Sequence, residues 1–561
     1  MSYSENTPTG RRQQYEAERT QLDSERQSWM ADWRDLGDYI LPRRVRFDTT
    51  DRNRGGRRAS KIIDGTATDS AIVLQSGLMS GVTSPARPWF RLVTPVPSLM
   101  KLSAVTRWLA DVEDVLRGIF EKSNLYNMLP TMYGDMGVFG TGVMLVLEDD
   151  KDVIRCYTLP VGSYWISNNE RLEIDLIYRQ TSMTVRQLVD QFGMENLSAA
   201  TKQVAESKQT EVWVDVIQRI GPNANYKPES PFAIHRKYSS CFYEKGGTED
   251  KLLGESGSDE FPAMCARWDV NGEDAYGNSP GMRALPDVKS LQLYEKKIAK
   301  AVDKMVDPPL VGPSSIAQRP VSLLPGGVTV ADVREGMQGL RPIHEVRFDI
   351  AGAELKSEGC RQRIRKSLFT DLFLMLANDQ RSNITATEIM QRQEEKMLML
   401  GPVLERVNDE LLGPLIDRTF AIAFRRGLIP TPPPELNGIE LKVEYSSIMA
   451  AAQRLLKIGG VDRFVATVGN MAAVDPTVLD KVNRDATVDF YADALAVPPD
   501  LVNDQDEAGA IRASRAQQQQ AAANAELMNS QANTAKVLSE TDTQSPSALS
   551  DLINAQTGSR L

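Results

Sequence analysis

Apolar residues recur at helical spacing over long parts of the chain, whereas short β-type runs gather between residues 140 and 270. The stretch 12–40 predicts an amphipathic helix, because Tyr15, Leu22, Trp29 and Leu36 repeat every seven residues and charges of both signs fill the remaining positions. We interpret it as a helix packed on its own domain rather than as a free coiled coil. The chain is therefore expected to be α+β and mainly helical.

The β-type runs predict a mixed region in the middle of the chain. Gly137, Gly140 and Gly142 indicate a tight turn into its first strand, since their spacing is not that of a dinucleotide-binding loop. The expected strands are 143–147, 153–166, 172–181, 211–220, 231–243 and 263–269, and the expected helices around them are 64–80, 101–129 and one near 184–206.

The stretch 280–306 predicts a helix with two distinct faces. On a wheel of about 100° per residue, five lysines share one arc and apolar residues share the opposite one. The lysines are Lys289, Lys296, Lys297, Lys300 and Lys304. Such a stripe is compatible with contact to DNA phosphates or to an acidic neighbouring subunit. A face that is simply exposed to solvent explains it equally well. Asp307-Pro308-Pro309 is expected to end the helix sharply.

The chain after this helix alternates between turn-rich and helical stretches. Residues 310–350 are rich in Pro and Gly and predict a small β-containing subdomain, followed by a helix over 354–377 and an exposed loop over 378–384. A long helix follows Thr385 and is expected to be kinked at Gly401-Pro402 and at Gly413-Pro414.

The last part of the chain becomes progressively more polar. Prolines at 430–434 predict a rigid linker, and 446–500 predict short helices joined by turns. The Ala- and Gln-rich stretch 505–540 predicts a polar helix that is stable only with neighbours, and 541–561 a disordered or docking tail.

Composition excludes several classes of protein. The 561 residues carry a formal charge of −10, so any contact with nucleic acid is expected to be local. Four cysteines without a C-x-x-C pair and only two histidines make a zinc site improbable and indicate reduced, buried thiols. Neither a signal peptide nor a membrane-spanning run is evident, which predicts a protein made and used in cytoplasm.

A basic run lies between residues 43 and 61 of this acidic chain. Eight Lys and Arg residues against Asp48 and Asp51 leave a local charge of +6. A contact with DNA or an acidic partner and a solvated loop fit this run equally well.

Catalytic motifs are missing from the sequence. It contains no phosphate-binding G-x-x-x-x-G-K-[ST] loop and no G-x-S-x-G elbow. His235, in a strand-like run, and His344 are interpreted as structural. We therefore expect no catalytic residues, no metal and no cofactor.

The most informative stretch is 64–92, in which a helix of small and apolar residues leads into a Ser-, Gly- and Pro-rich turn. Ser84, Pro85 and Pro88 fix the path of the turn, and Trp89 and Phe90 then form an apolar anchor that enters a strand.

This stretch and several others occur in the order found in one known family. The landmarks are Trp33, Tyr39 and Pro42; 80–90; 276–281; 307–309; 385–389 with Arg392 and Glu395; and Gly401-Pro402. Over roughly residues 12–500 the chain resembles the head-to-tail connecting, or portal, proteins of short-tailed bacteriophages. It departs from them at 445–450, where the family usually has a proline near position 448.

The resemblance implies a portal-type fold with a division that can be laid onto this sequence. The regions implied are a wing over 1–279, a first stem helix over 280–306, a clip over 307–353, a second stem helix over 354–377, a channel loop over 378–385, a long kinked helix over 386–429, a crown over 430–504, a barrel-like helical segment over 505–540 and a disordered tail over 541–561.

The resemblance also implies a function. Portal proteins form rings, typically of twelve subunits, at one capsid vertex, through which a separate terminase drives double-stranded DNA and from which DNA later leaves. The partners implied are copies of this chain, double-stranded DNA, the terminase large subunit, the tail adaptor, and the major capsid and scaffolding proteins, without a membrane. The expected location is the virion, after assembly in the host cytoplasm.

Mapped onto this sequence, the resemblance implies residues that approach DNA in the channel. They are Asn378, Gln380, Arg381 and Asn383 of the loop and Lys289, Lys296, Lys300 and Lys304 of the stem.

Two alternative functions are also considered. One is that of an internal virion core or scaffolding protein, which would be more uniformly helical, and the other is that of a metal-dependent nucleic-acid enzyme.

Overall fold

A computed structural model was analysed. It describes residues 10–47, 56, 58–96, 98–247, 249–308, 310–311, 341–342, 348–377, 400–436, 438, 441–445, 448–472, 476–494, 502 and 505–540. The chain divides into two compact units, residues 1–100 with 108–452, and residues 101–107 with 453–561. Each unit is described separately below.

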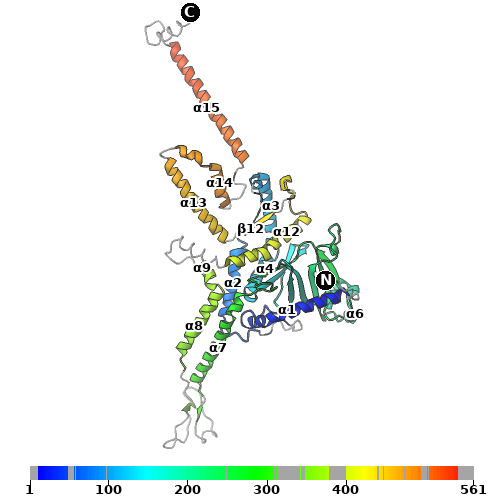
Figure 1. The fold of residues 1–561 in the computed structure, drawn as a ribbon. Coiled ribbons are helices and arrows are strands. Elements are labelled where there is room, and N and C mark those ends of the chain that lie inside the picture. The colour runs from blue at the N-terminus through cyan, green and yellow to red at the C-terminus, as the bar shows by residue number, and fades with distance from the viewer. Residues whose placement is uncertain are drawn as a thin grey trace. The chain divides into compact units, whose positions relative to one another are not determined.

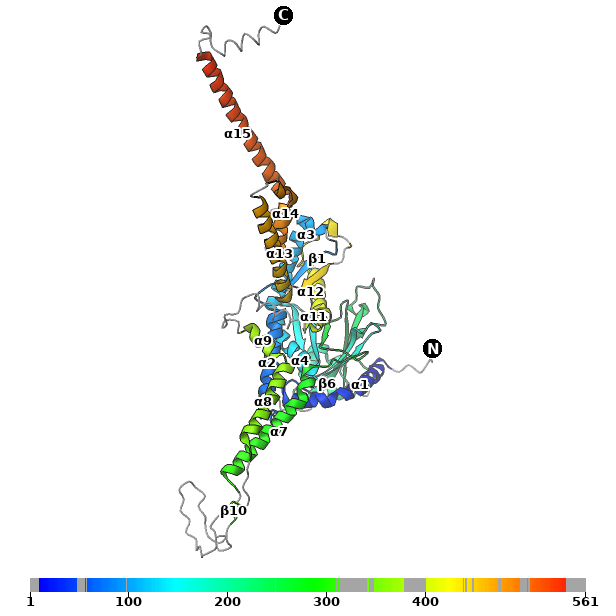
Figure 2. The ribbon, with the colours of Figure 1, turned by 60° about the vertical axis from the view of Figure 1, so that its left-hand side comes forward.

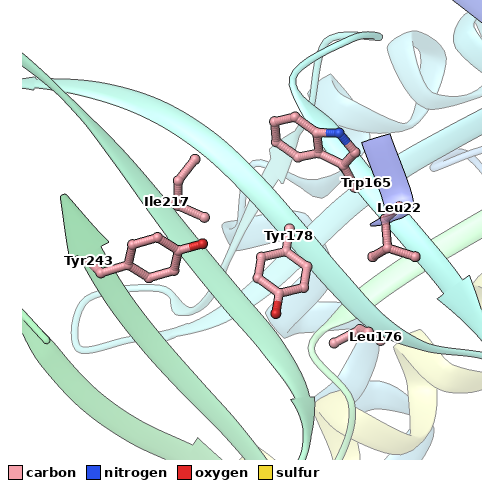
Figure 3. Packing of buried hydrophobic residues seen from close by; sticks show 6 residues of the cluster. All are labelled: Leu22, Trp165, Leu176, Tyr178, Ile217 and Tyr243. Atoms are coloured by element: carbon pink, nitrogen blue, oxygen red, sulfur yellow. The ribbon is translucent and has the colours of Figure 1, made fainter. Parts of the chain in front are cut away.

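Helix α1 (Arg11–Tyr39) packs on a sheet of its own unit (Figure 3). Its Leu22 joins Trp165, Tyr178 and further sheet residues in one apolar cluster. At the other end of α1, Trp33 is 1 % exposed and its Nε1 donates to the Phe139 carbonyl at 3.0 Å. The predicted packing of this helix on its own domain is confirmed.

Two antiparallel sheets of more than two strands lie in the first unit (Figure 1). The larger sheet follows chain order: β4 (Tyr164–Asn168), β5 (Ile174–Thr184), β6 (Trp213–Pro222), β7 (Tyr238–Glu244) and β8 (Gly254–Ser258). In the smaller sheet, β2 (Thr141–Asp149) lies between β3 (Val153–Thr158) and β9 (Ala263–Arg267). Short helices α5 (Val185–Phe192), η2 (Met194–Asn196) and α6 (Ala199–Glu206) connect β5 to β6.

Three predictions for this region were wrong in detail. The expected strand 153–166 is two strands, β3 and β4, because Pro160 and Gly162, whose φ is +92°, interrupt it. The start of 231–243 is a short helical turn, η3 (Ala233–His235), so His235 does not lie in a strand. Strand β8 was not expected, since its Gly- and Ser-rich sequence has no apolar alternation.

Small residues allow two helices of the first unit to approach closely. Helices α2 (Thr66–Val82) and α4 (Leu125–Phe139) pack together, and a Cβ at Gly137 would lie 2.5 Å from Leu74. The expected helix 101–129 is broken at Asn124, which separates α3 (Ser103–Lys122) from α4, and a short turn, η1 (Leu99–Lys101), precedes α3.

The turn predicted between Gly137 and Gly142 is confirmed. Gly140 ends α4 with φ of +89°, a conformation that favours glycine, and β2 starts at the next residue. A Cβ at Gly140 would also lie 1.8 Å from the Gly277 carbonyl oxygen, so this position admits no side chain.

Trp89 and Phe90 form the predicted anchor. Both are buried, at 2 % and 0 % exposed, and Phe90 begins strand β1 (Phe90–Val93), which pairs antiparallel with β12 (Lys442–Tyr445).

Helix α13 (Ile448–Ala472) starts where the family usually has a proline, a residue that the first turn of a helix accommodates well.

A widened helical turn marks the predicted kink near Gly413. Helix α11 (Gly401–Val407) passes into one π-helical turn, η6 (Asn408–Leu412), and then into α12 (Gly413–Arg425). The Gly413 amide donates to the Asn408 carbonyl, five residues back, and Pro414 has no amide to continue the ladder. A short turn, η7 (Pro434–Leu436), follows α12 in the proline-rich stretch.

The second unit is helical. It contains most of α13, the turn η8 (Pro476–Lys481), α14 (Arg484–Ala494) and α15 (Gln505–Glu540). The predicted polar helix over 505–540 is confirmed, and its Arg512 pairs with Asp485 of α14 at 2.6 Å. The tail 541–561 lies outside the described residues.

Candidate functional site

Helices α7 (Pro280–Val306) and α8 (Ile350–Ser367) lie side by side in the first unit (Figures 1 and 2). Beyond them, strand β10 (Leu310–Val311) pairs antiparallel with β11 (Arg341–Pro342). The helix predicted over 280–306 therefore has the predicted bounds, and its chain returns alongside it as a second helix.

The first turn of α7 is anchored in the core. The Ser279 hydroxyl accepts from the Met282 amide at 2.9 Å and donates to the Val138 carbonyl at 2.6 Å. Proline at the first helical position suits this start, because it needs no amide partner. Beyond it, Val288 and Leu291 are fully buried, so the first half of α7 is held rigidly.

A buried amide connects α7 to the start of α2. Gln292, 5 % exposed, accepts from the amides of Ile63 and Asp64 at 2.6 and 2.9 Å and donates to the Asp64 carbonyl at 2.8 Å. The position of Asp64 is thereby set by α7.

Arg361 of α8 joins these three elements through carboxylates. Its guanidinium lies 2.9 Å from Asp64 and 2.9 Å from Glu295 of α7, and it also contacts Glu354 and Glu358 of its own helix. The hydrogen bond to Asp64 raises the pKa of Arg361 above its ordinary value. Burial alone would raise the pKa of Asp64, but hydrogen bonds from Thr66 and Arg361 hold it below its ordinary value.

We expect Arg361→Gln to lower the free energy of unfolding by about 1–2 kcal/mol at pH 7, between the values of exposed and buried ion pairs. A carboxyl whose pKa is lowered on folding stabilises the protein above its unfolded pKa of about 3.9, and this stabilisation is lost as the pH falls through the lower folded value. The difference in the free energy of unfolding between Arg361→Gln and the wild type should therefore shrink below about pH 4.

Chemical denaturation of both proteins between pH 3 and 7 measures this difference. Arg365→Gln is the matched control, because Arg365 is 42 % exposed and its ion pair, with Glu358 of the same helix, is longer, at 3.4 Å. A loss that is equally large in the control, or that does not change with pH, would contradict the role assigned to Arg361.

The lysine stripe of α7 is exposed, but its members differ. Lys289 lies 2.5 Å from Asp35 of α1, which neutralises it within the same subunit. Lys296, Lys297, Lys300 and Lys304 are exposed and form no ion pair with any residue that the structure describes. The free positive charge therefore lies on the half of α7 that points away from Ser279.

The helix predicted over 354–377 is not continuous. It comprises α8 and a second helix, α9 (Thr370–Ala377), separated by Phe369, whose φ is +56°. The Phe369 ring lies 5.8 Å from that of Trp268, so tertiary packing accompanies this break. Ile364, Leu368 and Leu372 of these two helices and their junction are buried.

The remaining predicted site residues are only partly described. Asp307 ends α7 and its amide donates to the Asp303 carbonyl at 2.7 Å, so the predicted stop at Asp307-Pro308 is confirmed. Pro309 and the loop residues Asn378, Gln380, Arg381 and Asn383 lie outside the described residues, as does His344.

The basic run before α2 has partners within the fold at several positions. Arg44 donates to the fully buried Asp135 of α4, with Nε at 2.8 Å from Oδ1, and Lys61 pairs with Asp38 at 2.6 Å. Arg52, Arg54 and Arg57 lie outside the described residues.

No catalytic constellation occurs among the described residues. His235 contacts the Ser230 hydroxyl at 2.7 Å, and all four cysteines are free and buried. Where the chain is described, no group of His, Cys, Asp and Glu is arranged to hold a metal ion. Nor is any helix of that part both long and apolar enough to cross a bilayer.

The architecture is that of a structural connector: a mixed α+β body from which a rigid helix pair with exposed lysines extends. Residues 12–502 match the family described as bacteriophage head to tail connecting protein, and the chain belongs to that family. It is therefore a head-to-tail connector of the portal type and a component of the virion.

Two relatives match over nearly their whole length. The "Portal protein" of Salmonella phage epsilon15 is 45 % identical over 536 residues, which are 95 % of this chain and 96 % of the relative. The "Probable portal protein" of Bordetella phage BPP-1 is 42 % identical over 96 % of this chain and 97 % of the relative.

Solved structures with some likeness come from gene transfer agent particles. A chain of "Virion of native gene transfer agent (GTA) particle" matches with a TM-score of 0.30 and 12 % identity, over 71 % of this chain and 95 % of that one. A chain of "Neck of empty GTA particle computed with C6 symmetry" matches with a TM-score of 0.33 and 12 % identity, over 72 % and 85 %.

Proposed function

We propose that this connector assembles into a closed ring of twelve copies at one capsid vertex, through which double-stranded DNA is packaged and ejected. The observation that carries the proposal is the 45 % identity, over almost the full length of both chains, to a protein named as a portal. The chain itself has no catalytic part in this proposal. A separate terminase supplies the motor, and the ring also contacts the tail adaptor, the major capsid protein and the scaffolding protein.

The proposed division of the chain follows its helices. We assign the stem to α7 and to α8 with α9, the clip to the stretch that connects α7 to α8, and the wing to the two sheets with α1. The long kinked helix corresponds to α11 and α12, the crown begins after them, and α15 is the barrel-like segment. The channel loop is proposed for residues 378–385.

Electron microscopy of the purified protein tests the ring directly. We expect closed rings with twelvefold symmetry and a central opening wide enough for a DNA duplex. Monomers or dimers alone, over a range of salt and protein concentrations, would contradict the proposal and favour an internal core or scaffolding role. Hydrolysis of DNA by the pure protein with divalent metal would favour the enzyme alternative.

The negative net charge of the chain suits a channel through which DNA slides better than a protein that binds DNA tightly. A channel with many basic groups would bind phosphates tightly and retard the duplex, whereas this chain carries a net charge of −10. We propose that Lys296, Lys300 and Lys304 are among the few basic groups near DNA, together with Arg381 and its neighbours in the loop. Lys289 should contribute least, because Asp35 already neutralises it.

We expect Lys296→Gln/Lys300→Gln/Lys304→Gln to lower DNA packaging roughly threefold or more and to weaken its salt dependence, since three phosphate contacts are lost. Packaged DNA per capsid measures the effect, and Arg381→Ala is assayed in parallel. The control is Lys151→Gln/Lys208→Gln/Lys227→Gln, which removes three exposed lysines from other parts of the first unit. Normal packaging by both the stem and the loop variants would refute these assignments.

A further inference from the structure

A pocket of about 500 Å³ lies where the end of α1 meets the start of α2 in the first unit. Three arginines line it, Arg43, Arg44 and Arg58, together with Thr68 of α2. The rest of its wall consists of small and apolar residues between 40 and 59. No carboxylate lines the pocket within the part of the chain that the structure describes, so its charged wall is entirely basic.

One wall of the pocket is fixed by backbone hydrogen bonds. The amides of Ile40 and Leu41 donate to the Leu36 carbonyl at 2.8 and 3.1 Å, which continues the end of α1. The Arg44 carbonyl then accepts from the Val161 amide at 3.1 Å, and the Val161 carbonyl accepts from the Arg46 amide at 2.8 Å. The segment that presents Arg43 is therefore held between a helix end and the core.

The opposite wall and the floor are also tied down. Beyond Arg58, the Ile62 amide donates to the Ala59 carbonyl at 3.3 Å, and Lys61 pairs with Asp38 of α1 at 2.6 Å. The Thr68 hydroxyl donates to the Ile40 carbonyl at 2.9 Å and so connects the floor to the first wall. A ligand would meet a preformed pocket and would spend little free energy on ordering it.

The three arginines differ in how much charge they leave for a ligand. Arg44 is neutralised by the buried Asp135, whose Oδ1 lies 2.8 Å from Arg44 Nε. Arg58 is half-buried and has an interaction of its own within the chain. Arg43 is exposed and forms no ion pair with any residue that the structure describes. Asp69 lies one position beyond Thr68, but it is exposed and is not part of the wall.

We propose that this pocket, which we call the Arg43 pocket, binds phosphate groups of the DNA backbone. The planar fork of arginine matches the oxygens of a phosphate group, with two parallel hydrogen bonds. The run 43–61 that forms the pocket contains seven arginines but a single lysine, and arginine is the residue preferred for phosphate recognition. One chain carries the whole pocket, so binding does not require the ring. The choice of DNA as the source of the phosphate rests on the proposed function.

Size and lining favour a nucleic-acid strand over a free anion. A free phosphate would occupy only a small part of 500 Å³, whereas ligand pockets of this size enclose larger groups. A phosphodiester continues into a sugar on each side, and its carbon atoms match the apolar wall at Leu41 and Pro42. A contact through one or two arginines is also weak enough to let a duplex move on, in keeping with the acidic balance of the chain.

Binding of a labelled duplex of about 20 base pairs tests the proposal, measured by fluorescence anisotropy with the full-length protein at about 50 to 200 mM salt. The variants are Arg43→Gln/Arg58→Gln, which removes both charges, and Arg43→Lys, which keeps the charge and removes the fork. The matched control is Arg171→Gln/Arg186→Gln, because it removes two arginines, 81 % and 63 % exposed, from elsewhere in the same unit. Thermal unfolding of each protein shows that it is folded.

We expect Arg43→Gln/Arg58→Gln to weaken binding of the duplex about five- to tenfold at low salt, with Arg43→Lys in between and the control unchanged. The slope of log K against log salt should become shallower by about 1 to 2, since each lost phosphate contact removes roughly 0.9. The stem variant Lys296→Gln/Lys300→Gln/Lys304→Gln should lose binding independently of the pocket. If the double variant does not fold, Arg43→Gln alone decides the question, because Arg43 is exposed and has no ion pair to lose.

Several outcomes would overturn the proposal. An equal loss in the control would show that the duplex senses only net charge, and unchanged binding would show that the pocket is not used. If the duplex does not bind but inorganic phosphate raises the unfolding temperature of the wild type and not of Arg43→Gln/Arg58→Gln, the occupant is a free anion. Binding of hexaglutamate without binding of the duplex would identify an acidic protein segment instead.

Failure of this proposal is distinguishable from failure of the proposed function. Closed rings whose binding of DNA is unaffected by Arg43→Gln/Arg58→Gln would leave the portal function intact and overturn the pocket alone. Pocket-dependent binding of the duplex by a chain that forms no rings would do the reverse.

Discussion

Glu410→Ala is expected to lower the free energy of unfolding by about 3–5 kcal/mol, the usual cost of leaving one partner of a buried ion pair alone. Arg267, whose side chain is 4 % exposed, lies with Nη2 at 2.6 Å and Nε at 3.1 Å from Glu410 Oε1. Glu410 Oε2 also accepts from the Arg267 amide at 2.8 Å. Removing the carboxylate thus leaves the Arg267 charge without a counter-charge and its backbone amide without an acceptor, although the Leu172 carbonyl still accepts from Nη2 at 2.9 Å.

The position of this pair explains why its loss should be large. Glu410 lies in the π-helical turn η6, and Arg267 is the last residue of β9, so the pair connects the kinked helix to the smaller sheet. Chemical denaturation measures the change, with Asp409→Ala as control, because Asp409 is an exposed neighbour in the same turn. Arg267→Met/Glu410→Leu should recover most of the loss, because it leaves no unpaired charge. A loss below about 1 kcal/mol for Glu410→Ala would show that the carbonyls of Leu172 and Asp274, which already accept from the Arg267 guanidinium, are sufficient partners for it.

Trp89→Ala is expected to cost a similar amount, about 3–5 kcal/mol, through the cavity left in the core. The Trp89 ring centroid lies 4.7 Å from that of Phe90 and 5.7 Å from that of Phe120, and its Nε1 donates to the Tyr126 hydroxyl at 3.1 Å. The substitution therefore removes packing between β1, α3 and α4 together with one hydrogen bond.

Trp89→Phe separates the two contributions, since it keeps an aromatic ring and loses the hydrogen bond, worth about 1 kcal/mol. Trp213→Ala is the control for a tryptophan that is 43 % exposed. Equal losses from Trp89→Ala and Trp213→Ala, measured by denaturation of the unassembled chain, would contradict the assignment of Trp89 as an anchor.

The elements that the sequence predicted well are those whose signal is local. Helices α1 and α7 have the expected bounds to within one residue because periodic stretches followed by prolines define them, and α15 because its Ala- and Gln-rich stretch favours a helix. The turn at Gly140 and the kink near Gly413 were expected for the same reason, since glycine and proline restrict or free the backbone where they stand.

The misses have a common physical cause. The helix over 354–377 breaks at Phe369, whose neighbour Trp268 lies about a hundred positions away, and nothing in the local periodicity signals that contact. Strand β8 exists because β7 offers it an edge, although its own residues have weak β-propensity.

The same distinction holds for the candidate site. The spacing of the five lysines on α7 was enough to place them on one face. Only the structure showed that Asp35 neutralises Lys289, whereas the other four form no ion pair within the part of the chain that the structure describes. Nothing in the sequence singled out Arg361. Its role depends on Asp64 and Glu295, which come from two other elements.

The sequence by itself determined the family, through the order of its landmark motifs. It also determined most helices and strands and the faces they present, because these depend on periodicity and on residues with special backbone requirements. Tertiary structure alone decided which charges meet. Arg267 and Glu410 are far apart along the chain, as are Arg361 and Asp64. Ion pairing depends on distance and burial in three dimensions, and a one-dimensional pattern contains neither.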